Sequence, residues 1–304
     1  MEKIKRNVSD LMIKLGYPED AQKDFANALD RIAADRVATA WLKHLVAQHD
    51  ADMNCNYNQM MSDIRVLGDT LGIHNYTSDM LLFLALGEKL RERYIEKGID
   101  EKLYYTAMND LRCKLEECRL VHGINGTFVA FWYPGFFQMT RFAFCRLQFE
   151  VIQLKKDYEV GGISLPVGTK FLNMHIPKTG TRLDHDEVLE SYRQAAAHFA
   201  DQLEGQPIVF TCNSWMLDTW HTTVLSPTSN MIAFYNDFKI VETGFYKDYS
   251  SVWRIFDKQY DGDVDALPTD STLRRAYAER IRRGEPTGYS RGIFIWKDGQ
   301  IINS

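Results

Sequence analysis

The sequence predicts an α/β (α+β) protein in which an all-helical N-terminal domain, residues 1–122, precedes a mixed-sheet domain, residues 123–304. Up to about residue 122, apolar side chains recur every three to five positions, which is typical of helices. From about residue 140 they alternate at every second position, as in strands with one buried face. A length of 304 residues accommodates two domains.

The first half is predicted to be a series of helices separated by glycines. An isolated glycine after a periodic apolar segment favours a helix end. The predicted segments are one helical face from Phe25 to Leu45, helices over 57–71 and 77–97, and a fourth helix that ends near Gly123.

The second half is predicted to alternate strands with helices, an order typical of a sheet that has helices on its faces. The predicted strands are 141–154, 170–176, 208–213, 240–246 and 251–256. Asp184 is predicted to cap a helix, and further helices are expected from Trp215 and Leu273. The Asp-Gly pair within 297–299 predicts a hairpin turn there.

Composition excludes several classes of protein. The net charge of −5 argues against a nucleic-acid coat, and no apolar run approaches the ~20 residues of a membrane span. The N-terminus has no apolar segment of a secretory signal. Five cysteines without a C-x-x-C pair argue against disulfides and a structural metal site. We therefore expect a cytoplasmic protein that acts on a small molecule without a metal, a membrane or a nucleic acid.

A polar loop lies between the predicted strand 170–176 and the predicted helix at Asp184. It consists of Lys178, Thr179, Gly180, Thr181 and Arg182. Two cations, two hydroxyls and the amides near a helix start suit a phosphate group. The alternative is an ordinary polar turn in which Gly180 supplies a positive φ.

Two residues are candidates for a general base. Glu150 shares a strand face with Arg146, so it is either a base in a cleft or one half of an ion pair. His175 lies at the end of the strand before the polar loop. Histidine accepts protons near neutral pH, although a lone strand histidine is also common as a structural donor.

Cys212 and Ser214 complete the candidate catalytic set. They share one face at the end of the predicted strand 208–213. Cys212 would be a nucleophile if His175 lowered the pKa of its thiol, and it would otherwise be a small buried residue. Ser214 has an alternative role as the cap of the short helix that begins at Trp215.

Several phrases of the second half resemble one group of GNAT-like acyltransferases, which join a helical N-terminal domain to a GNAT-like C-terminal domain. The phrases are Arg146-Leu147-Gln148-Phe149, His175-Ile176-Pro177, Cys212-x-Ser214-Trp215-x-Leu217-Asp218 and Ser229-Asn230. The resemblance implies transfer of an acyl group from coenzyme A to a small amine or hydroxyl. It also implies that Glu150 or His175 is the base and that the 178–182 loop holds the coenzyme A pyrophosphate.

Two alternatives remain open at this point. The phrase from His175 to Thr181 also resembles the phosphosulfate-binding loop of sulfotransferases, in which the 177–182 loop would grip a donor nucleotide. The strand that follows lacks the arginine which that family needs. The glycine-rich pyrophosphate signature of ordinary GNAT enzymes is not found either. This favours, as a further alternative, a non-catalytic protein that binds a small ligand on a GNAT-like scaffold.

Overall fold

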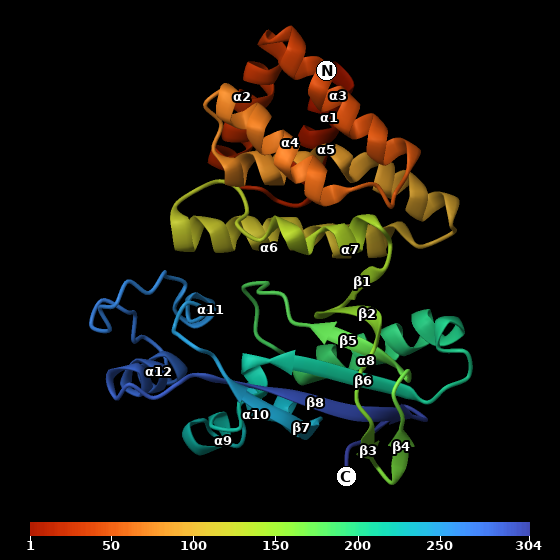
Figure 1. Ribbon diagram of the computed structural model, residues 1–304, viewed down its shortest axis with the longest axis vertical. Helices are drawn as coiled ribbons and strands as arrows, with labels where there is room; N and C mark the ends of the chain where they lie inside the picture. The colour runs from red at the N-terminus through yellow and green to blue at the C-terminus, as the bar shows by residue number, and fades with distance from the viewer. The chain divides into compact units, whose positions relative to one another are not determined.

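The structure, a computed structural model that describes residues 1–304, contains two compact units, Met1–Phe142 and Ala143–Ser304 (Figure 1). The first unit is helical and the second is built on a sheet, so the predicted fold class is confirmed. Residue 122, where the sequence placed the end of the helical domain, is the last residue of a long helix. The first unit continues beyond it to Phe142.

The first unit consists of helices that agree closely with the apolar periodicity. They are α1 (Glu2–Lys14), α2 (Glu19–Ala34), α3 (Arg36–Ala51), α4 (Tyr57–Thr70), α5 (Asn75–Glu96), α6 (Glu101–His122), the 3-10 helix η1 (Ala130–Trp132) and α7 (Pro134–Phe137). The single face predicted from Phe25 to Leu45 is divided between α2 and α3. Asp35 separates them, because its extended backbone ends α2 and its side chain accepts from the Ala38 amide to cap α3.

Helix α5 forms the centre of this unit. Its side chains from Met80 to Leu86 are almost completely buried, so α5 has no solvent-facing stripe in this segment. The aromatic residues after α6 pack onto it, since the rings of Tyr133 and Phe137 lie 4.8 and 5.1 Å from that of Phe83. The aromatic stretch that precedes the sheet therefore belongs to the core of the helical unit.

The second unit contains a seven-stranded mixed sheet in the order β1-β2-β5-β6-β8-β7, with β9 also paired to β8 and with a separate β3–β4 hairpin. The strands are β1 (Arg141–Phe144), β2 (Leu147–Gln153), β3 (Tyr158–Val160), β4 (Ile163–Leu165), β5 (Lys170–His175), β6 (Ile208–Ser214), β7 (Lys239–Phe245), β8 (Gly288–Lys297) and β9 (Gln300–Ile302). The helices of the unit are α8 (His185–Phe199), η2 (Ala200–Leu203), η3 (Trp215–Leu217), α9 (His221–Val224), α10 (Asn230–Asn236), α11 (Trp253–Phe256) and α12 (Thr272–Arg282).

Two predictions of local structure are wrong. The single strand predicted over 141–154 is a hairpin of β1 and β2, because Cys145 adopts a φ of 46° and turns the chain. The segment 251–256 is helical at α11 and not a strand. Its apolar side chains Val252 and Phe256 lie one helical turn apart and are both buried.

Strand register assigns every side chain of the sheet to one of two faces. On the helix-covered face, Tyr192 of α8 packs against Phe149, Phe210 and Phe294. On the other face, which we call the hairpin-covered face, Val160 and Leu165 of the β3–β4 hairpin pack against Phe171 and neighbouring apolar residues. The hairpin-covered face changes from apolar to polar side chains toward the end of β5.

The parallel strands β5 and β6 pair over a short distance. Their register pairs are Leu172 with Phe210 and Asn173 with Thr211, whereas the strands continue to His175 and Ser214. Toward their C-terminal ends the two strands therefore have no further register pair, and we call this unpaired part of the sheet the opening. The loop that follows β5 begins at this opening and leads to α8.

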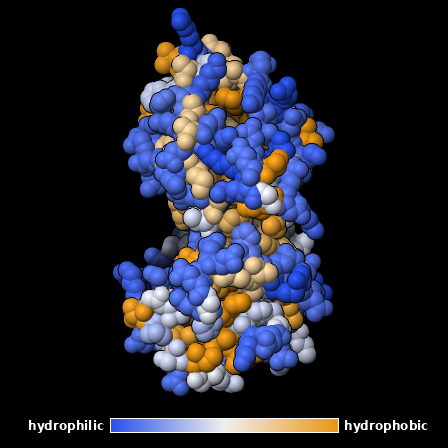
Figure 2. Space-filling model, turned by 90° about the vertical axis from the view of Figure 1, so that its right-hand side faces the viewer, coloured by the Kyte–Doolittle hydropathy of each residue, from blue (hydrophilic) through white to orange (hydrophobic).

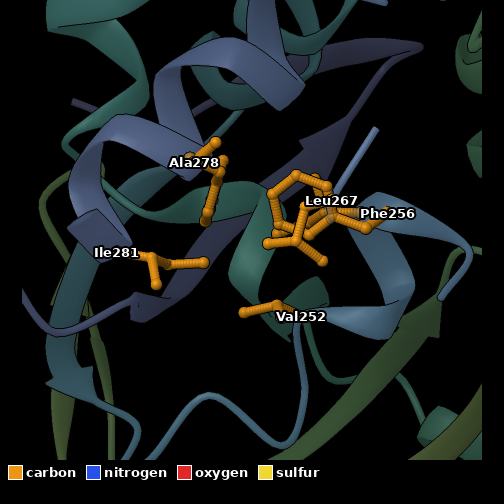
Figure 3. Packing of buried hydrophobic residues seen from close by; sticks show 7 residues of the cluster. Val252, Phe256, Leu267, Ala278 and Ile281 are labelled. Carbon is orange, nitrogen blue, oxygen red and sulfur yellow. The ribbon is translucent and has the colours of Figure 1, made fainter. Parts of the chain in front are cut away.

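A small hydrophobic cluster fixes the segment around α11 and α12. Figure 3 shows Val252, Phe256 and Leu267 turned toward Ala278 and Ile281 of α12. All five are nearly inaccessible to solvent. This packing holds Asp257, the residue that directly follows α11, in a defined position.

Hydrophilic side chains form most of the surface in the view of Figure 2, and hydrophobic ones interrupt it in small groups. Large exposed apolar residues include Val37, Phe131 and Phe245. None of the helices combines the length and the apolar composition that a membrane span requires.

Candidate active site

Glu150, Asn173 and His175 meet on the hairpin-covered face beside the opening. Glu150 of β2 lies opposite Asn173 of β5, and His175 is two residues further along the same strand. The Glu150 Oε1 atom is 2.8 Å from His175 Nε2 and accepts a hydrogen bond from Asn173 Nδ2 at 3.2 Å. Both ends of the Glu150–His175 pair are about one-fifth exposed. The structure thus places Glu150 and His175, the two candidate bases from the sequence, in direct contact.

The position of the proton in this cluster depends on the tautomer of His175, whose Nε2 also lies 3.1 Å from Asn173 Nδ2. An ionised Glu150 only accepts hydrogen bonds, so His175 donates its Nε2 proton to it. The Nδ1 atom of a neutral His175 then has the lone pair that accepts a proton. A carboxylate that orients a histidine in this way also stabilises the cation formed on protonation. The arrangement is chemically suited to general base catalysis.

The start of the loop after β5 is anchored by two contacts. Arg146 Nη1 donates to the carbonyl oxygen of Pro177 at 2.7 Å. Lys178 forms an ion pair with Asp257, which also accepts from Arg274 Nη2 at 2.6 Å. Asp257 follows the buried α11 segment, so the hydrophobic cluster of Figure 3 holds the carboxylate that anchors Lys178.

The middle of the loop is exposed. Gly180 has a φ of 79°, and no atom lies near the position of a Cβ there. The Thr179 and Thr181 hydroxyls lie 2.8 Å apart, and Arg182 is exposed. Asp184 caps α8 as predicted, by accepting from the amides of Asp186 and Glu187. The first amides of α8 are therefore engaged by the protein's own side chain, so an anion would bind to the loop before the helix.

Cys212 and Ser214 occupy structural positions. Thr211 pairs with Asn173, so Cys212 points to the helix-covered face, away from His175. Its side chain is 1% exposed, and burial raises the pKa of its thiol to about 12. Ser214 caps η3 by accepting from the Met216 amide at 3.1 Å. We therefore do not propose either residue as a catalytic group.

The phrase that runs from Cys212 to Asp218 ends in a buried ion pair. Asp218 Oδ2 accepts from Arg280 Nη1 at 2.7 Å and from the Gly288 amide at 3.0 Å. Nearby, His221 Nε2 lies 2.8 Å from the Tyr277 hydroxyl and Nδ1 lies 3.3 Å from the Met216 carbonyl. Burial lowers the pKa of His221. His221 joins α9 to α12, and Asp218 joins α12 to β8.

Sequence reasoning missed three residues of the site. Asn173 shares a strand face with His175, and the alternation of side chains was the signal that would have included it. Asp257 and Arg274 approach the loop from positions far along the chain. No local pattern indicates that contact.

Two family models match almost the whole chain. A model described as the GNAT-like C-terminal domain matches residues 142–294, which is half of the chain, and a model described as the N-acyltransferase N-terminal domain matches residues 6–139. The mixed sheet of the second unit and the helical first unit are the corresponding structures. The chain therefore belongs to the GNAT-like acyltransferase family with a helical N-terminal domain, and the resemblance seen in the sequence is confirmed.

Solved structures share this fold. One is an acyltransferase in complex with decanoyl-CoA and teicoplanin, with 21% sequence identity, a TM-score of 0.72, and coverage of 94% of this chain and 86% of that chain. Another is an acyltransferase mutant in complex with octanoyl-CoA, with 21% identity, a TM-score of 0.71, and coverage of 93% and 86%. No curated protein matches the chain.

Proposed function

We propose that the protein transfers an acyl group from an acyl-coenzyme A donor to an amine or hydroxyl of a small acceptor, in the cytoplasm. The observation that carries this proposal is the Glu150–His175 pair, which lies beside the opening between β5 and β6 and next to the anchored loop. The family match and the acyl-CoA complexes of the similar structures support it. They favour neither the sulfotransferase nor the non-catalytic alternative.

In this proposal the donor supplies an acyl group activated as a thioester. The amides of the loop, the Thr179 and Thr181 hydroxyls and the exposed Arg182 hold its pyrophosphate. Lys178 is already paired with Asp257, so its role is to fix the loop.

His175 acts as the base and Glu150 orients it. As the acceptor nitrogen bonds to the thioester carbon, His175 Nδ1 takes the proton that this nitrogen loses. The carbon–sulfur bond breaks, the leaving thiolate takes up a proton from solvent, and His175 returns its proton to solvent, so an amide and a free thiol are formed. A backbone amide of β5 near the opening would polarise the thioester carbonyl.

The test is release of free coenzyme A thiol from acetyl-, octanoyl- and decanoyl-CoA in the presence of an amine panel. We expect amine-dependent release that falls at least 100-fold in His175→Ala and Glu150→Gln. Thermal shifts with coenzyme A are expected to persist in both variants and to weaken in Arg182→Gln. If both base variants kept wild-type turnover, the assigned base would be incorrect. Protection by adenosine 3′,5′-bisphosphate but not by coenzyme A would favour the sulfotransferase alternative.

A further inference from the structure

A row of polar side chains crosses the hairpin-covered face at the level of His175. Because Asn173 is level with Thr211 on the parallel strand β6, His175 is level with Asn213. Asn213 pairs with Arg291 of β8, and Arg291 pairs with Glu242 of β7. Paired residues point to the same face of a sheet, so His175 and Arg291 lie on the same face, on opposite sides of the opening.

One of the three guanidinium nitrogens of Arg291 forms a hydrogen bond within the protein. Its Nε donates to Glu242 Oε2 at 3.3 Å, and its side chain is 19% exposed. Neither terminal nitrogen of its guanidinium donates a hydrogen bond to the protein. A bulge at Val241 sets the position of Glu242, since the register shifts between Ile240 and Glu242.

The charges around Arg291 leave its terminal nitrogens available for an anion. Glu242 is the acidic residue that contacts it, and the other oxygen of Glu242 accepts from Lys156 at 2.6 Å and from the Tyr158 hydroxyl at 2.9 Å. The Glu242 charge is therefore shared between two cations. A guanidinium with two parallel terminal N–H donors matches the geometry of a carboxylate.

We propose that Arg291 is a specificity residue that binds an anionic group of the acceptor, so the preferred acceptors combine an amine with a carboxylate. This proposal rests on the proposed acyl transfer. Neighbouring strands lie about 4.7–4.9 Å apart, so β5 and β8, two strands apart, are separated by about 10 Å. The acceptor therefore needs a spacer of about this length between the amine next to His175 and the carboxylate next to Arg291.

The experiment compares ω-amino acids with their neutral amides. The probes are γ-aminobutyrate, 6-aminohexanoate and 8-aminooctanoate, each paired with its amide, and the readout is kcat/KM for thiol release at saturating octanoyl-CoA. Wild type is expected to prefer the longer acids over their amides about tenfold, the contribution of a charged hydrogen-bonded pair. Arg291→Gln is expected to reduce this ratio to near one while acylation of the amides persists.

Arg193→Gln is the matched control, because Arg193 is a 63% exposed arginine that is also paired with a glutamate. Its acid-to-amide ratio is expected to equal that of wild type. An unchanged ratio in Arg291→Gln, or a wild type without preference for the acids, would overturn the role of Arg291 while leaving acyl transfer intact.

If no probe is acylated, calorimetric binding of 8-aminooctanoate and its amide to protein saturated with coenzyme A decides the question. Preference for the acid that is lost in Arg291→Gln supports the anion site, and equal affinity overturns it. If the proposed acyl transfer itself is wrong, the protein will neither bind the donor nor release thiol with any amine. This outcome is distinct from the loss of preference for the acids.

Discussion

The two faces of the sheet in the second unit are built from the same strands but serve different purposes. The helix-covered face contains Phe149, Phe210 and Phe294, each in ring contact with Tyr192 of α8, together with the buried thiol of Cys212. The hairpin-covered face places Glu150, Asn173 and His175 beside the opening. Because successive residues of a strand point to opposite faces, one strand supplies a core residue and a candidate site residue at adjacent positions.

The largest effect is expected on stability, from the substitution Phe210→Ala on the helix-covered face. Phe210 is fully buried on the helix-covered face, and loss of such a ring costs about 3–5 kcal/mol in the free energy of unfolding. Chemical denaturation measures the loss. Phe245→Ala is the control, since Phe245 is 63% exposed, and it is expected to change stability by less than about 0.5 kcal/mol. Equal losses in the two variants would contradict the assignment of Phe210 to the core.

The next effect concerns turnover and not stability. If Glu150 orients His175, then Glu150→Gln, His175→Ala and the double variant are each expected to lower kcat/KM by about 10²–10⁴. The double variant is expected to be no slower than His175→Ala, because the two residues act as one unit. A double variant whose loss equals the product of the single losses would show that the residues act independently.

A smaller effect is expected from the ion pair that anchors the loop after β5. Lys178→Met removes the contact with Asp257 but retains the length of the side chain. Since the pair is partly exposed, the stability change is expected to be about 1 kcal/mol or less. The affinity for coenzyme A is expected to fall several-fold, as measured by titration calorimetry. Lys258→Met, one residue beyond Asp257 and outside this contact, is the control.

The smallest effect is a pH dependence at the buried His221. Burial lowers the pKa of His221 in the folded protein, so below the unfolded pKa of about 6.5 the unfolded chain binds more protons than the folded chain. Stability attributable to His221 is therefore complete above that pH and is lost as the pH falls. The melting temperature of wild type is expected to fall more between pH 7 and 5 than that of His221→Gln. Parallel curves for the two proteins would exclude this linkage.

The helices, most strands and the Glu150 and His175 candidates were predictable because each depends on local periodicity. The hairpin at Cys145 was not, since a φ of 46° at a non-glycine residue has no sequence signature. The helical α11 was taken for a strand because four residues are too few to show a period. The contact of Lys178 with Asp257 joins positions that only the folded chain brings together.

Strand β8 has a consequence for how the protein is made. It lies between β6 and β7 in the sheet, although it follows both of them in the chain by more than 40 residues. During synthesis, β6 and β7 leave the ribosome without the partner that each of them needs, and their unpaired edges are exposed until β8 arrives. We therefore expect the second unit to acquire its structure late and to depend on chaperones when translation is slow.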